Sequence, residues 1–168
     1  TAADFNVWVA SAAGALGQGT TSYYNLWPNT THYFKVKVST DPDAGYTSPV
    51  STSTLAAEVA GTQIAGVFLD SATVSWTALP LSPSSSTCEG YRVDASTDIN
   101  FTGALFSSST LQPGLAALTV PGLAHNTTYY FRVGPVNWNN VPNYISAGST
   151  PTQIETPTSV YIDEVTTY

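Results

Sequence analysis

Sulfur and positive charge are almost missing from this chain of 168 residues, which contains one cysteine, no methionine and four basic side chains. The single thiol, Cys88, has no second cysteine to pair with and lacks the spacing of a metal or haem motif. Eleven acidic residues give a net charge of −7, and the basic side chains lie apart, at Lys35, Lys37, Arg92 and Arg132. Nucleic-acid binding needs clustered basic residues, so this composition argues against it, and against anionic membrane surfaces as well.

Long apolar runs are also missing. No stretch reaches the length needed to span a bilayer, so we expect no membrane insertion in this segment. The chain opens without the basic and apolar blocks of a signal peptide, which indicates a mature chain or a fragment. Charged residues make up only 9% of the chain, while Ser, Thr, Asn and Gly are abundant. This composition is common in secreted and surface proteins. We therefore expect an extracellular or cell-surface location.

What the chain does contain is one stretch that occurs twice. Residues 123–133 (LAHNTTYYFRV) match residues 26–36 (LWPNTTHYFKV), and Tyr130 corresponds to Tyr33 at a constant offset of 97 positions. In both copies polar and apolar side chains alternate after the Asn-Thr-Thr, which predicts a strand with one face against a core. A corner and a strand repeated at about a hundred residues, the size of one sandwich domain, indicate two copies of one β-sandwich.

The start of the repeated stretch predicts a tyrosine corner, in which a tyrosine near the start of a strand bonds back to the preceding loop through its hydroxyl. We assign this role to Tyr33 and Tyr130, with Leu26 and Leu123 as the apolar residues of the two corners.

Strands are expected wherever apolar residues alternate between turn signals. The expected strands cover residues 5–9, 20–24, 32–38 and 46–55 in the first half, and 64–69, 72–77, 89–96, 103–106, 118–120, 129–136 and 144–149 in the second. Residues 56–61 form a short linker between the halves. Trp76 shares one face of its strand with Ala72 and Val74, so we expect it in a core.

Residues 64 to about 154 resemble a fibronectin type III domain, through Trp76 on the second strand, Leu123 at the corner, and Tyr130 with the Asn-Thr-Thr before it. The resemblance implies an all-β chain of tandem immunoglobulin-like β-sandwiches. It also implies a module of extracellular proteins, although the Arg-Gly-Asp adhesion tripeptide of some members is absent.

The resemblance divides the chain unevenly. The expected parts are an incomplete first domain at residues 1–57, a complete domain at residues 58–154, and a linker with the first strand of a further or neighbouring domain at residues 155–168. Aligning Phe5 with Tyr91 starts the chain at the third strand, so the first sandwich lacks its two N-terminal strands. Two explanations stay open. The chain is a window from a longer repeat protein, or a tail strand through Val160, Ile162 and Val165 completes the next copy head to tail.

No pattern of catalytic or metal-binding residues is visible, so we expect no enzyme activity and no cofactor. His32 and His125, the only histidines, flank the two corners without converging partners. The sequence Asp41-x-Asp43-x-Gly45 lacks the third oxygen ligand and the distal glutamate of a calcium loop, and predicts an ordinary turn.

Some aromatic and asparagine residues are candidate binding or modification sites, on weaker evidence than the fold. Trp27, Trp138 and Tyr144 are candidate binding aromatics, because exposed rings stack on sugars or partner surfaces. Three sequences fit the N-glycosylation acceptor pattern, at Asn29, Asn100 and Asn126. We expect a structural repeat of an extracellular fibre, stalk or adhesin, whose partners are neighbouring copies or further repeats of the chain. The alternative is an accessory or carbohydrate-binding module of a secreted polysaccharide-degrading enzyme, with glycans as partners.

Overall fold

A computed structural model describes residues 14, 19–38, 40, 45–159, 161 and 163 of the chain. Within these residues all the regular structure is β-strand, apart from one turn of 3-10 helix. The elements in chain order are β1 (Thr31–Phe34), β2 (Val50–Ser53), β3 (Ala60–Val67), β4 (Ser71–Thr77), η1 (Ser84–Ser86), β5 (Gly90–Ser96), β6 (Leu105–Thr110), β7 (Ala117–Pro121), β8 (Thr128–Val136) and β9 (Ile145–Pro151).

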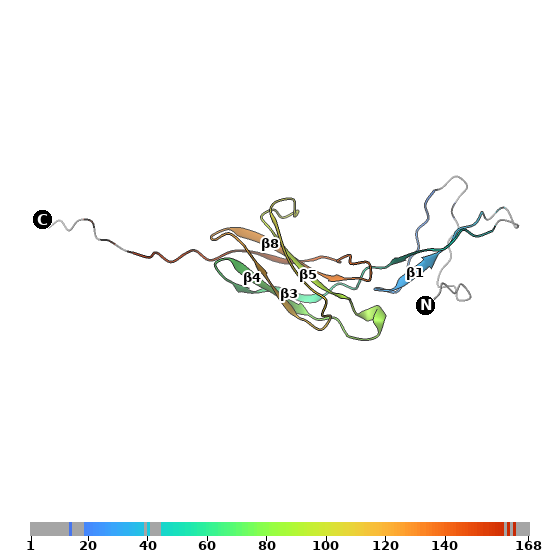
Figure 1. Ribbon diagram of the computed structural model, residues 1–168, viewed down its shortest axis with the longest axis horizontal. Helices are drawn as coiled ribbons and strands as arrows, with labels where there is room; N and C mark the ends of the chain where they lie inside the picture. Colours follow the sequence, from blue (N-terminus) through green and yellow to red (C-terminus); the bar gives the residue numbers. More distant parts are fainter. Residues whose placement is uncertain are drawn as a thin grey trace.

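The second half folds into a sandwich of two antiparallel sheets, visible as two layers in Figure 1. One sheet has the strand order β3-β4-β7 and the other β6-β5-β8-β9. All seven strands expected from the alternation are present, with their ends shifted by a few residues. In this half the sequence therefore predicted both the number of strands and their order along the chain.

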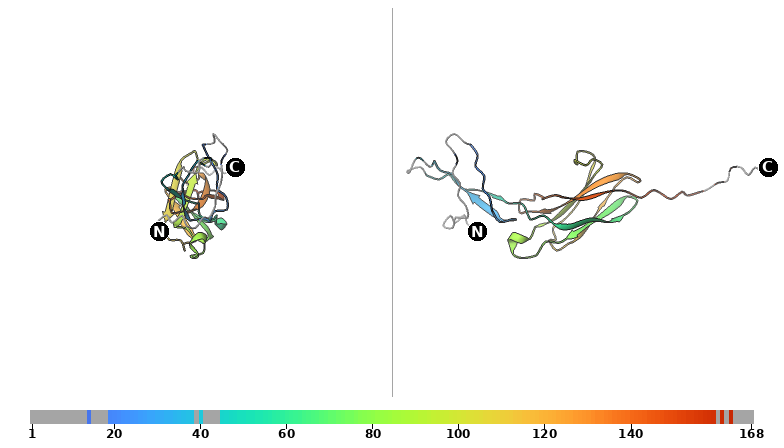
Figure 2. Two further views of the ribbon diagram at one scale, coloured as in Figure 1. Left: turned by 90° about the vertical axis from the view of Figure 1, so that its right-hand side faces the viewer. Right: turned by 180° about the vertical axis from the view of Figure 1, so that it is seen from behind.

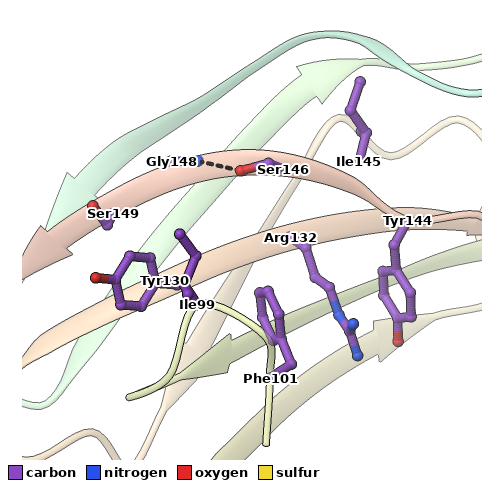
Figure 3. A pocket seen from close by; sticks show the side chains of 9 residues that line it. All are labelled: Ile99, Phe101, Tyr130, Arg132, Tyr144, Ile145, Ser146, Gly148 and Ser149. Carbon is purple, nitrogen blue, oxygen red and sulfur yellow. Dashed lines mark hydrogen bonds between the residues drawn. The ribbon is translucent and has the colours of Figure 1, made fainter.

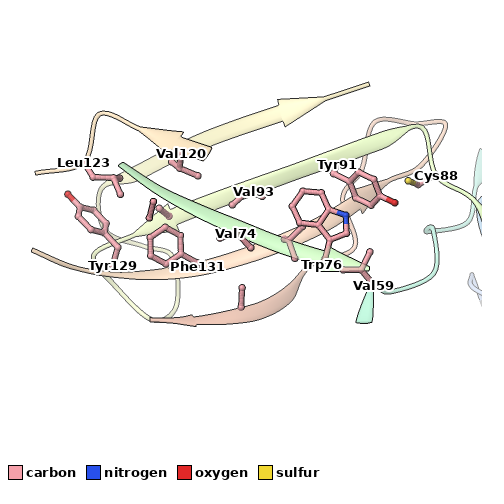
Figure 4. Close-up of a cluster of buried hydrophobic side chains, with 14 of the residues drawn as sticks. Val59, Val74, Trp76, Cys88, Tyr91, Val93, Val120, Leu123, Tyr129 and Phe131 are labelled. Carbon is pink, nitrogen blue, oxygen red and sulfur yellow. The ribbon is translucent and has the colours of Figure 1, made fainter. Parts of the chain in front are cut away.

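The core of the sandwich is built by the period-two pattern of its central strands. In β4, the side chains of Ala72, Val74 and Trp76 are buried, while the residues between them are partly exposed. They face buried residues of β5 and β8 across the sandwich, and the Trp76 ring lies 4.8 Å from that of Tyr91 between ring centres (Figure 4). Burying one such side chain contributes roughly 1.5–3 kcal/mol, so this apolar stripe is the main source of stability.

The described part of the first half is one two-stranded ladder, and it reproduces the end of the second half. In β1 and β2, Thr31 pairs with Ser53. In β8 and β9, Thr128 pairs with Pro151. The partners correspond at offsets of 97 and 98 positions, and the next three pairs follow in the same register. The repeat in the sequence is therefore a repeat in the structure.

Outside this ladder the first half has less regular structure than the alternation predicts. Residues 20–24 form no strand, and the strands expected at residues 32–38 and 46–55 shorten to β1 and β2. A strand persists only where its backbone finds a partner, and alternation alone does not supply one. The strand expected at residues 5–9 and the donor strand through Val160, Ile162 and Val165 lie outside the described residues.

The molecule is elongated, with β1 and β2 beyond one end of the sandwich, while the chain leaves β9 at the other end (Figures 1 and 2). Residues 54–59 join the two parts. Ala56 and Val59 in this linker are 1% and 2% exposed and belong to the core of the sandwich. The linker is thus anchored to the second unit along its length.

Candidate functional site

Each unit ends in a turn held by the same hydrogen bonds. In the first unit the Thr54 hydroxyl donates to the carbonyl of Trp27 (2.5 Å) and accepts from the N–H of Thr30 (3.1 Å). The equivalent bonds of the second unit join Thr152 to the carbonyl of Ala124 (2.6 Å) and the N–H of Thr127 (3.0 Å). The asparagine of each Asn-Thr-Thr has positive φ, 44° at Asn29 and 48° at Asn126. Asparagine adopts this left-handed backbone conformation more easily than most residues. This explains why both turns have an asparagine at that position.

The corner hydrogen bond of the second unit is made by Tyr129, and the assignment to Tyr130 is corrected. The Tyr129 side chain is buried, and its hydroxyl accepts from the N–H of Ala124 (3.0 Å). Tyr130 points to the opposite face of β8, because successive strand residues alternate. The alternation of β8 carried the signal for this choice, because Tyr129 shares its face with Phe131 and Val133, which are buried.

The same correction applies to the first unit, where His32 takes the position of the corner tyrosine. His32 corresponds to Tyr129 at the offset of 97, and its Nε2 lies 3.5 Å from the carbonyl oxygen of Trp27, five residues upstream. The His32 side chain is buried, whereas that of Tyr33 is 40% exposed. Leu123 is buried at the second corner, and Leu26 is half-buried at the first.

The two units meet at a junction whose central residue is Asn137, in the loop between β8 and β9. This side chain is 2% exposed. Its Nδ2 donates to the carbonyls of Ser53 (3.2 Å) and Thr54 (3.1 Å) in the first unit. Its Oδ1 accepts from the N–H groups of Asn139 (3.0 Å) and Val141 (2.9 Å) in its own loop. Two donors and two acceptor positions are the full capacity of an amide, so one side chain shapes the loop and fastens it to the neighbouring unit.

Two further asparagines of this loop bridge the junction. Asn139 Nδ2 donates to the hydroxyl of Thr52 (2.9 Å), and Asn143 Nδ2 donates to the carbonyl of Ala56 (2.9 Å). Asparagine is common in turns for local reasons, so the sequence predicted a hairpin loop here and carried no signal for a role between units.

From the other side of the junction, Asn29 reaches into the second unit. Its Nδ2 donates to Glu89 Oε1 (3.1 Å) and to the carbonyl of Ser84 (3.4 Å), and the residue is 1% exposed. Nδ2 is the atom to which an N-linked sugar would attach, so Asn29 is not a glycosylation site in this arrangement, contrary to the sequence pattern. Asn100 and Asn126 are both exposed.

A buried carboxylate organises the outer face of the larger sheet. Asp94 is fully buried and accepts hydrogen bonds from Arg92 (2.9 Å), Ser107 (2.6 Å) and Arg132 (2.9 Å). Burial alone would raise the pKa of Asp94, but hydrogen bonds from Ser107, Tyr144 and the two arginines outweigh it and hold the pKa below its ordinary value. The carboxylate therefore stays charged and fixes both guanidinium groups.

Beside this cluster lies an open groove of about 560 Å³, lined mainly by the residues labelled in Figure 3. The Arg132 guanidinium lies between two rings, with its central carbon 4.0 Å from the ring centre of Phe101 and 3.8 Å from that of Tyr144. Asp94 carries one negative charge against the two guanidinium groups of Arg92 and Arg132, so the cluster keeps a net charge of +1. The groove therefore presents aromatic surface and hydroxyl groups beside a partly compensated cation.

The contact between Arg132 and Tyr144 has a counterpart in the first unit. Lys35, which corresponds to Arg132, has its Nζ 4.4 Å from the ring centre of Tyr46, which corresponds to Tyr144 at an offset of 98. A cation over an aromatic ring at the same place in both units indicates a structural role for Tyr144 besides any binding role.

The other predicted binding aromatics do not gather in the groove. Trp138 is 59% exposed and follows Asn137 in the junction loop, and Trp27 is 63% exposed at the first corner. The structure thus separates Tyr144 from Trp27 and Trp138.

Two other titratable side chains, His125 and Cys88, have distinct surroundings. His125 pairs with Glu155 at the surface, Nδ1 to Oε1 2.8 Å, and burial raises the pKa of the Cys88 thiol. Among the described residues, no group of three or more His, Cys, Asp or Glu side chains could hold a metal ion. In the same part of the chain, no helix has the length and apolar character to cross a membrane.

Comparison with known proteins identifies the fold. No family model and no curated protein matches the chain. The structure of the FN1–FN3 domains of chicken CNTN1 matches with a TM-score of 0.50 at 15% identity, over 80% of this chain and 46% of that one. A two-domain fibronectin type III segment of chicken tenascin gives a TM-score of 0.48 at 20% identity, over 73% and 65%. The FN5 domain of Drosophila Lar gives 0.46 at 17%, over 60% and 100%. The chain is all-β, with the immunoglobulin-like sandwich of fibronectin type III domains.

Proposed function

We propose that this chain is a structural repeat module of an extracellular or cell-surface fibre, stalk or adhesin. The observation that carries the proposal is the junction, where polar side chains of both units interlock and two linker residues, Ala56 and Val59, are buried. A module that bears load or sets a distance needs a defined angle to its neighbour, and a docked junction supplies one. The extracellular location is supported by the low fraction of charged residues and by the fibronectin type III sandwich, which is common in extracellular modules.

The hydrogen bonds are sufficient in number to hold the docked arrangement. Among the described residues, five side-chain bonds join the first unit to the second, and a sixth, from Asn143 to Ala56, holds the linker. Each contributes about 0.5–1.5 kcal/mol net. Even about 3 kcal/mol in total would favour the docked arrangement more than a hundredfold, because about 1.4 kcal/mol corresponds to a factor of ten.

Rigidity in solution tests the proposal. X-ray scattering and NMR residual dipolar couplings of the whole chain should show the two units moving as one body. Asn137→Ala should give the units separate alignment, while Asn100→Ala, on a loop away from the junction, should change nothing. Independent motion of the units in the unaltered chain would contradict the proposal. Antibody labelling of intact producing cells tests the location.

Head-to-tail assembly by strand complementation is a further part of the proposal. The described first unit is a two-stranded ladder with apolar side chains exposed, among them Val36 and Val50 at 62% and 68%. A donated strand through Val160, Ile162 and Val165 would cover such a face. Sedimentation should then show concentration-dependent polymers that vanish when the chain is cut after residue 159. Polymers that persist after the cut, or that never form, would favour the other explanation, that this chain is a segment of a longer repeat protein.

The groove favours a second candidate function, carbohydrate binding by an accessory module of a secreted polysaccharide-degrading enzyme. Phe101 and Tyr130 present ring surface there, and sugars stack on such rings. Glycan-array binding that is lost in Phe101→Ala and kept in Trp138→Ala would place sugar in the groove, and the opposite result would place it on the junction loop. An array without any signal would remove this candidate.

A further inference from the structure

We propose that the end of the sandwich beyond β9 is a second docking face, built to receive a further unit of the same design. This inference deepens the proposed structural role by naming the partner of one surface. It follows from comparing that end of the second unit with the end of the first, which is already docked.

Every group that the first unit offers at its junction has an equivalent at the end of the second. The side chains are the same, because Thr52 corresponds to Thr150 and Asn29 to Asn126. The remaining acceptors are backbone carbonyls, which do not depend on residue type. Those of Ser53, Thr54 and Ala56 correspond to those of Pro151, Thr152 and Ile154.

The equivalent groups are also held in the same local geometry. The N–H of Asn29 donates to the carbonyl of Leu55 (2.9 Å), and that of Asn126 donates to the carbonyl of Gln153 (3.1 Å). The φ angles of the two asparagines differ by 4°, being 44° and 48°. What differs is burial, since Asn29 is 1% exposed and Asn126 is in the exposed class. The second unit supplies the cover over Asn29, so Asn126 presents the same preformed turn to solvent.

The chemistry of the face determines what fits it. The Pro151 carbonyl accepts from the Thr150 hydroxyl (3.2 Å), and a carbonyl oxygen can accept a second hydrogen bond. The carbonyls and the Thr150 hydroxyl of this face can therefore accept from donors, which a loop like residues 137–143 provides through three asparagine amides. The Asn126 amide needs an acceptor in the position of Glu89. The corresponding loop of the first unit, residues 40–45 (TDPDAG), has no asparagine, and its aspartates accept without donating.

A second copy of this chain therefore cannot repeat the contact through its first unit, and its second unit already uses its own loop. The partner is a sandwich unit with an Asn-x-Asn loop and an acidic residue before its third strand.

The test replaces residues 154–168 by one further unit in the natural spacing. Because Leu55 corresponds to Gln153, a copy of residues 56–154 is joined directly after Gln153. We expect scattering from one longer rod, and slowed hydrogen exchange of the Asn126 side-chain amide relative to the original chain. Asn126→Gly keeps the left-handed backbone and removes the side-chain amide. It should loosen the new junction as Asn29→Gly loosens the first, and it should leave the urea midpoint of the original chain unchanged.

An appended unit that tumbles independently would overturn the inference. So would an Asn126→Gly variant that behaves identically in the extended and original chains. Either result would leave the proposed structural role standing, because that role rests on the first junction. Evidence against the proposed structural role would be different, namely independent motion of the two units in the original chain.

Discussion

Replacing Tyr129 with phenylalanine tests the corner assignment most directly. The ring stays in the core, and only the hydroxyl that accepts from the N–H of Ala124 (3.0 Å) is removed. Leaving a buried donor without a partner costs about 1–3 kcal/mol. Ala124 itself is exposed, so water reaches its N–H in part, and we expect the lower half of that range, about 1.5 kcal/mol.

Urea unfolding followed by tryptophan fluorescence provides the measurement, because Trp76 packs in the core and reports its loss. With a urea dependence of about 1 kcal/mol per molar for a domain of this size, the midpoint should fall by about 1.5 M. Tyr130→Phe is the matched control. Its hydroxyl lies outside the corner, and the change should stay within about 0.5 kcal/mol. If Tyr130→Phe were as costly as Tyr129→Phe, the sequence-based assignment would be right and the structural one wrong.

Three other changes probe the remaining polar network. Asn137→Ala should separate the motion of the two units and lower the unfolding midpoint, because it removes bonds on both sides of the junction. Asp94→Asn should cost about 3 kcal/mol near neutral pH, since two guanidinium groups lose their charged acceptor. The folded pKa of Asp94 is lowered, so its contribution is complete above the unfolded pKa of about 3.9 and is lost as the pH falls through the folded value. Urea titrations from neutral to acid pH should show that loss in the natural chain and not in Asp94→Asn. Burial raises the pKa of both Tyr91 and Tyr144 to about 12, so their contribution to stability is present below the ordinary tyrosine pKa and is lost as the pH rises through 12. Phenolate absorbance should show late titration from Tyr91 and Tyr144, and Tyr144→Phe should reduce the amplitude of that late phase.

Much of the fold could be read from local pattern. Ala72, Val74 and Trp76 recur every second residue, and the pleat of a strand sends such residues to one face whatever surrounds it. That rule placed Trp76 in a core, and the recurrence of the Asn-Thr-Thr stretch predicted two related units. In the same way, the separation of Phe131 and Val133 from Tyr130 and Arg132 needed no tertiary information.

The residues that join the units could not be found this way. Asn29 and Asn137 match local turn and glycosylation patterns, which explain them without a neighbour. The alternation places Tyr129 on the inner face, but its hydrogen bond with Ala124 depends on the path of the preceding loop. In the first unit a histidine takes the place of this tyrosine.

The sequence alone therefore determined the class of fold, its repeat and the faces of its strands, since these follow from the geometry of a single strand. Only the tertiary structure decided that the Tyr129 hydroxyl reaches the N–H of Ala124, that asparagines fasten the junction, and that Arg132 lies between two rings. Those contacts join residues far apart in the chain, and loop positions in space, not residue order, bring their donors and acceptors within reach.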